Sequence, residues 1–127
     1  MHFNSKNGII NYGYDLVSYF ELNKSQKGNA SISYTYMGQI YHFASQAHRS
    51  KFIANPMKYE PQYGGWCAYA MGASGEKVAI DPETFKIVQG KLYLFYHTWI
   101  NNTLNKWNDD ELNLKNSADK NWTITLK

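Results

Sequence analysis

Cysteine occurs only once in this 127-residue sequence, at Cys67. A single cysteine cannot form an intrachain disulfide, so a disulfide-stapled scaffold is excluded. Arginine also occurs once, at Arg49, whereas the other basic residues are lysines scattered singly along the chain. Because arginine is the residue best suited to forked recognition of phosphates and guanine edges, we expect no nucleic-acid binding.

Long apolar runs are also missing, and no stretch approaches the roughly 18 residues that a membrane span requires. We therefore predict no transmembrane segment. Charged residues make up only 18% of the chain, but hydrophobic residues reach 43% and aromatic residues 17%. This composition excludes a disordered chain and predicts one domain with one core. Tyrosine dominates the aromatic residues, which suits surfaces that are apolar on one side and hydrogen-bonded on the other.

Two segments show the alternation of apolar and polar residues that is typical of β-hairpins. In residues 31–43 the alternation continues on both sides of Gly38, and residues 85–95 repeat it around Gly90. Asp15 and Ser45 stand where helix N-caps would, and the second helix is expected to stop at Asn55, before a proline. The predicted fold is a small α+β domain with two β-hairpins in an antiparallel sheet, packed with several short helices.

The ends of the chain are predicted to lie outside the domain. Residues 1–13 are polar and read as an arm along the surface, residues 14–122 form the domain, and residues 123–127 are a tail, extended at best. Residues 99–107 have apolar side chains near helical spacing, and a last helix is expected over residues 112–118.

Several motifs occur together in an order that resembles a YHS domain. They are YDLVSYF at residues 14–20, YMGQIYHFAS at 36–45 and FIANPMKY at 52–59. The segments PQYGGWCAY at 61–69 and GKLYL at 90–94 are similar to the longer, exported bacterial branch of that family. The resemblance covers roughly residues 9 to 122. It implies a periplasmic or secreted protein whose signal peptide is missing from this sequence.

The resemblance also implies a metal-related role, because the family is associated with copper and other soft or borderline ions. Its cysteines lie in an Asp-Pro-Val-Cys opening and a Tyr-Phe-Cys-Ser-x-x-Cys junction. In this sequence those positions carry Ser18, Ala44 and His48. Since thiolates hold soft ions in such sites, the resemblance implies that the fold is kept and that the family's own metal site is not.

Cys67 is then the likeliest anchor of a different metal site, because it is the one soft donor and follows two adjacent glycines. With His48 or His97 as nitrogen partner, it would suit copper or zinc. The opposing interpretation is a small buried cysteine with a structural role. A thiol enzyme is a third reading, in which a histidine and an orienting group, Asp81 or Asn101, would accompany Cys67.

Two further features of the sequence are candidate sites. The acidic run at residues 109–111 is ordinary for a helix start. Aromatic residues around the glycine pair could line a pocket for a flat ligand: Tyr63, Trp66, Tyr69, Tyr93 and Tyr96. The sequence thus predicts a non-catalytic YHS-like binding module whose partner is a metal ion or a small ligand. The alternative is a small-molecule or protein-docking module that has lost its metal site.

Overall fold

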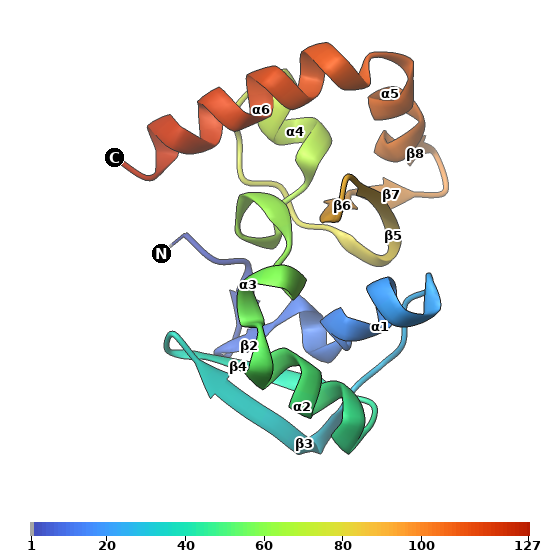
Figure 1. Cartoon of the computed structure of the whole chain (residues 1–127). Helices are drawn as coiled ribbons and strands as arrows, with labels where there is room; N and C mark the ends of the chain where they lie inside the picture. The colour runs from blue at the N-terminus through green and yellow to red at the C-terminus, as the bar shows by residue number, and fades with distance from the viewer. Residues whose placement is uncertain (1) are drawn as a thin grey trace.

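The N-terminal half of the chain builds a four-stranded sheet, seen in a computed structural model that describes residues 2–127 (Figure 1). The strand order is β1-β2-β4-β3, with these bounds: β1 (Ser5–Lys6), β2 (Ile9–Ile10), β3 (Asn29–Tyr36) and β4 (Gln39–Phe43). Strands β3 and β4 form the first predicted hairpin. Met37 and Gly38 turn it with φ angles of 52° and 77°, the left-handed geometry that two-residue hairpin loops require.

The second predicted hairpin is also confirmed, as β5 (Asp81–Val88) paired antiparallel with β6 (Lys91–Phe95). The two hairpins lie in separate sheets rather than in one. In the first sheet β4 is paired on both sides, with β3 and with β2, which runs parallel to it through Ile9 and Ile40. No edge of β4 is therefore left for the second hairpin.

Side-chain caps start the helices where the sequence predicted them. Asp15 caps α1 (Leu16–Leu22), and Ser45 caps α2 (Gln46–Ala54) by accepting a hydrogen bond from the amide of His48. After Asn55 the chain continues through α3 (Pro56–Tyr59) and a 3-10 turn, η2 (Gln62–Gly65). The second half supplies α4 (Ala68–Ala73), α5 (Thr103–Asp109) and α6 (Glu111–Thr125).

Both predicted chain ends differ from the structure. Part of residues 2–13 forms β1, β2 and a 3-10 turn, η1 (Asn11–Gly13), and Ile10 is buried in the core, so this segment is part of the domain rather than an arm along its surface. The expected extended tail is wrong as well, because α6 continues to Thr125. Packing explains it: Ala118 is fully buried, and Asn121 donates a hydrogen bond to the carbonyl of Met71 at 2.7 Å.

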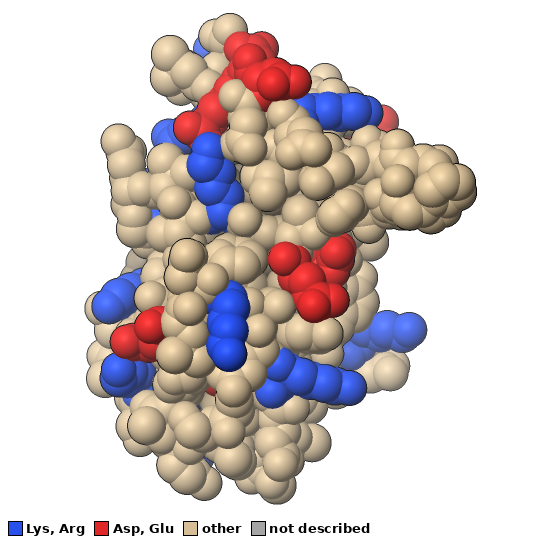
Figure 2. All heavy atoms as spheres, turned by 90° about the vertical axis from the view of Figure 1, so that its right-hand side faces the viewer, with Lys and Arg blue, Asp and Glu red and all other residues tan. Residues whose placement is uncertain are grey.

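The helix expected over residues 99–107 begins only at Thr103. Trp99 and Ile100 instead form the turn between two short strands, β7 (His97–Thr98) and β8 (Asn101–Asn102). Trp99 is 95% exposed there. Figure 2, which views the molecule from the right of Figure 1, shows an uncharged projection at the height of β7 and β8.

The buried residues form two clusters that share strand β6, with Leu92 and Leu94 in the first and Tyr93 and Phe95 in the second. Phe52 on α2 lies at the centre of the first, in ring contact with five aromatic neighbours: Tyr34, Tyr36, Tyr41, Phe43 and Tyr59. Trp107 on α5 anchors the second, against Tyr93 and Phe95 of β6. Residues 59–67 contribute to both clusters, with Tyr59 and Cys67 in the first and Tyr63 in the second.

Candidate functional site

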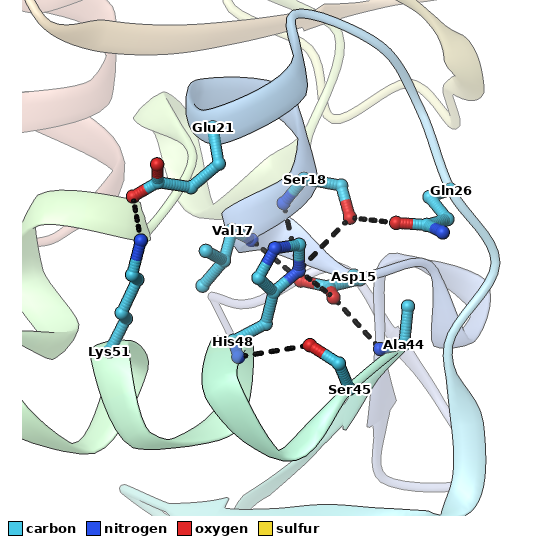
Figure 3. Close-up of polar contacts among 9 residues, drawn as sticks. All are labelled: Asp15, Val17, Ser18, Glu21, Gln26, Ala44, Ser45, His48 and Lys51. Carbon is cyan, nitrogen blue, oxygen red and sulfur yellow. Dashed lines mark hydrogen bonds and ion pairs between the residues drawn. The ribbon is translucent and has the colours of Figure 1, made fainter.

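The carboxylate of Asp15 is fully buried and is the centre of a polar cluster between α1 and α2 (Figure 3). One oxygen accepts hydrogen bonds from the amides of Val17 at 2.8 Å and Ser18 at 3.3 Å. The other oxygen accepts a hydrogen bond from the amide of Ala44 at 2.8 Å and lies 2.7 Å from Nδ1 of His48. This one side chain therefore ties the start of α1 to the junction between β4 and α2.

The three positions at which the YHS family carries cysteines meet at this cluster. Ser18, Ala44 and His48 all contact Asp15 through a backbone amide or a side chain. The donor set does not fit a soft ion, however. Ala44 has no ligand atom, and the Ser18 hydroxyl donates to the Gln26 side chain at 2.9 Å. These residues therefore form a hydrogen-bond network and supply no thiolate ligand for a metal ion.

The same cluster is not arranged as a catalytic triad. In a triad the carboxylate holds one imidazole nitrogen and the nucleophile contacts the other. Here Asp15 and the Ser18 hydroxyl both approach Nδ1 of His48, at 2.7 and 3.5 Å. Proton transfer from Ser18 to a carboxylate-oriented histidine is therefore not supported by this geometry.

Cys67 is fully buried at the start of α4, where its sulfur has two polar neighbours. It accepts a hydrogen bond from the amide of Tyr96 at 3.2 Å, and the hydroxyl of Thr103 lies 3.5 Å away. Thr103 donates its own hydrogen to the carbonyl of Tyr96 at 2.5 Å, so the thiol is the donor in its contact with Thr103. These contacts are those of a structural cysteine.

His97 lies on β7 in a different environment from Cys67. Its Nδ1 contacts the hydroxyl of Thr84 at 2.8 Å, and Thr84 donates to Asp81 at 2.9 Å. The structure therefore pairs His97 with Asp81 through Thr84, but it does not add Cys67 to this pair. Among residues 2–127 no group of three or more His, Cys, Asp or Glu side chains is arranged to hold a metal ion. Cys67, His48 and His97 belong to three separate networks.

A pocket of about 250 Å³ opens beside residues 60–64, which follow α3 in the chain. Its buried walls come from Ile10, Tyr41 and Tyr63, and Met57 at its rim is 79% exposed. The rest of the described lining comes from the N-terminal segment, residues 60–64 and the last helix: Phe3, Glu60, Pro61, Gln62, Gly64 and Trp122. The walls are thus drawn from positions up to 119 residues apart (122 − 3).

Backbone contacts hold these distant segments together. The backbone amide of Asn4 donates a hydrogen bond to the carbonyl of Gly64 at 2.7 Å, and the side chain of Asn4 donates one to the carbonyl of Gly65 at 3.0 Å. Gly64 has a φ of 63°, and a side chain there would meet the carbonyl of His2 and the indole ring of Trp122 at 2.5 and 2.9 Å. Only glycine allows this close approach, so Gly64 has a packing role.

Glu60 is the one ionisable acid among the described residues of the pocket. Its carboxylate accepts a hydrogen bond from the hydroxyl of Tyr41 at 3.1 Å. Partial burial raises the pKa of the Glu60 carboxyl above its usual value, and the Tyr41 hydrogen bond opposes that shift less strongly. The pocket therefore combines apolar walls with a carboxylate whose charge is incompletely solvated.

Of the five aromatic residues expected to line a pocket for a flat ligand, the structure places one at this pocket. Tyr63 lines the pocket, whereas Tyr93 is buried in the second core and the indole of Trp66 donates to the carbonyl of His2. Tyr69 and Tyr96 pack against the buried clusters. Sequence reasoning missed Glu60, although an isolated carboxylate beside an aromatic-rich stretch was an available signal.

Comparisons of the chain with protein-family models, curated proteins and solved structures found no match. The likeness to a YHS domain therefore rests on the sequence motifs. None of the helices within residues 2–127 combines the length and apolar content needed to cross a membrane.

Proposed function

We propose that the chain is a non-catalytic binding module, similar to a YHS domain, whose pocket beside Glu60 takes a small organic ligand. The observation that carries this proposal is the pocket itself, a cavity with aromatic walls and one convergent polar group. Small-molecule sites in proteins have this character. The resemblance to the exported branch supports action in the periplasm or outside the cell.

A binding role also agrees with the chemistry of the other candidate groups. The buried thiol of Cys67 contacts a hydroxyl and an amide, and neither of these is a base that could activate it. Ser18 and Asp15 meet the same nitrogen of His48. Neither cluster supplies a nucleophile, a base and an orienting group in the relation that acyl transfer requires.

The proposal is tested by screening small aromatic and amine compounds against isotope-labelled protein with heteronuclear NMR. We expect bound compounds to shift the signals of Tyr41, Gly64 and the Trp122 indole. Trp122→Ala should weaken binding about threefold to tenfold, because one aromatic wall is lost. Trp99→Ala is the matched control, since Trp99 is exposed on the β7–β8 turn and should leave affinity unchanged. A screen in which no compound perturbs these signals would reject the proposal.

Binding of copper or zinc is a second candidate function, favoured by the Asp15–His48 pair. A metal-ligating histidine usually has its other ring nitrogen hydrogen-bonded to a carboxylate or carbonyl, and His48 is held in this way by Asp15. A single oriented imidazole is a weak site compared with the three or four ligands of a zinc centre.

We expect any copper or zinc that purified protein takes up to be removed by dialysis and to depend on His48. Metal content after loading under reducing conditions should fall in His48→Gln. It should be unchanged in Cys67→Ser and His97→Gln, because those side chains belong to other networks. Stoichiometric metal that disappears in Cys67→Ser would contradict this assignment and restore Cys67 as the anchor.

A further inference from the structure

The side chains that line the pocket define the kind of ligand it can attract. Four of them are aromatic: Phe3, Tyr41, Tyr63 and Trp122. The thioether of Met57 lies at the rim, and Glu60 supplies the only formal charge among the described lining residues, a negative one. An aromatic enclosure with one carboxylate is chemically unlike a site for an anion or a sugar phosphate.

Both features favour a positive charge. The faces of aromatic rings carry negative electrostatic potential, and cages of such rings are the known way in which proteins bind ammonium groups. The carboxylate of Glu60 adds a full negative charge in a setting less polar than water, where Coulomb attraction is stronger. Its contact with the Tyr41 hydroxyl occupies one oxygen, Oε1.

The molecule's second hollow has the opposite character. It is more open and its lining includes Lys6, Lys27 and His42, with no acidic side chain among the described residues. A cation would be repelled there. The contrast makes the charge preference a property of the pocket beside Glu60 rather than of the whole surface, which carries a formal net charge of +3.

We propose that the pocket beside Glu60 binds an organic cation, an amine or a quaternary ammonium group held among aromatic rings with Glu60 as counter-ion. This inference rests on the proposed function and specifies its ligand class. The cavity of about 250 Å³ is smaller than the roughly 300–1,000 Å³ typical of pockets for drug-sized molecules. It therefore suits a small cation or the head group of a larger one.

The state of Glu60 predicts how binding depends on pH. Burial raises the pKa of the Glu60 carboxyl, and a bound cation would lower it again by stabilising the carboxylate. Affinity should consequently fall as the pH is lowered through the pKa of Glu60. The titratable group in contact with Glu60 is Tyr41. Burial raises the pKa of the Tyr41 hydroxyl above its ordinary value, so Tyr41 stays neutral while Glu60 titrates.

The experiment pairs each cation with a neutral compound of the same shape. Choline is paired with 3,3-dimethylbutan-1-ol, benzylamine with benzyl alcohol, and butylamine with butan-1-ol. Each compound is titrated against the full chain at neutral pH, and binding is followed by heteronuclear NMR. We expect at least one cation to bind about tenfold or more tightly than its neutral partner. Glu60→Gln should remove most of that preference and abolish the loss of affinity at acid pH.

A second acid-to-amide variant controls for changes in overall charge. Glu83→Gln alters an exposed carboxylate on β5 that does not line the pocket, so the cation preference should persist in it. Equal binding of cations and neutral partners would overturn the cation assignment and leave the small-molecule pocket standing. Binding of no compound, with the protein shown to be folded by its NMR spectrum, would overturn both.

Discussion

Replacing Asp15 by alanine is expected to remove at least about 3 kcal/mol from the free energy of unfolding. The carboxylate accepts hydrogen bonds from the backbone amides of Val17, Ser18 and Ala44. The substitution leaves these three donors inside the protein without their acceptor. Each buried polar group that loses its partner costs about 1–3 kcal/mol. Nδ1 of His48 loses its nearer partner at the same time and keeps only the Ser18 hydroxyl, 3.5 Å away. Urea denaturation followed by circular dichroism measures the loss.

The matched control for this substitution is Asp109→Ala. Asp109 is exposed at the end of α5, so its removal should change stability by no more than about 0.5 kcal/mol. Asp15→Asn provides a finer test. It can still accept hydrogen bonds through one oxygen, but its amide group would face the Ala44 amide with a donor instead of an acceptor. A loss of less than about 1 kcal/mol in Asp15→Ala would show that the cap is dispensable.

Substitution of Gly72 by alanine is expected to destabilise the second half of the chain, although it adds only one methyl group. A methyl group at Gly72 would lie 2.5 Å from the carbonyl oxygen of Leu114, which is backbone of α6. Alanine is normally preferred to glycine within a helix by about 1 kcal/mol. Here the collision makes the change in stability unfavourable, because a backbone oxygen cannot rotate away from the added methyl group. Helices α4 and α6 must therefore separate. Overpacking of this kind costs about 1–3 kcal/mol.

The separation of α4 and α6 should also reach the pocket. Trp122 belongs to α6 and lines the pocket, so Gly72→Ala is expected to weaken ligand binding as well as lower the melting temperature. Gly38→Ala is the comparison. Gly38 has a φ of 77° and open space around its Cβ direction, so it tests backbone strain without collision. It should lower the melting temperature and leave binding intact. Unchanged stability in Gly72→Ala would contradict the close helix contact.

Local sequence determined the elements whose causes lie within a few residues. Asp15 and Ser45 were readable as caps because a helix start needs an acceptor for its own first amides. The two hairpins were readable because the alternation of side chains and the turn glycines are neighbours in the chain. The resemblance in residues 14–59 drew attention to Ser18, Ala44 and His48, which stand where that family carries cysteines. It did not show that Asp15 gathers Ser18, Ala44 and His48 around one buried carboxylate.

Only the tertiary structure decided the ends of the chain and the pocket. In the sequence, residues 1–13 read as an arm along the surface and residues 121–127 as an extended tail. The described residues of both segments instead pack against distant partners: the Asn4 amide donates a hydrogen bond to the carbonyl of Gly64, and the Asn121 side chain donates one to the carbonyl of Met71. The pocket depends on the same contacts, because Phe3 and Trp122 approach Glu60 only after these segments have packed. The sequence determined each side chain's chemistry, whereas long-range packing decided which of them share a site, because neighbours across the fold leave no periodic pattern along the chain.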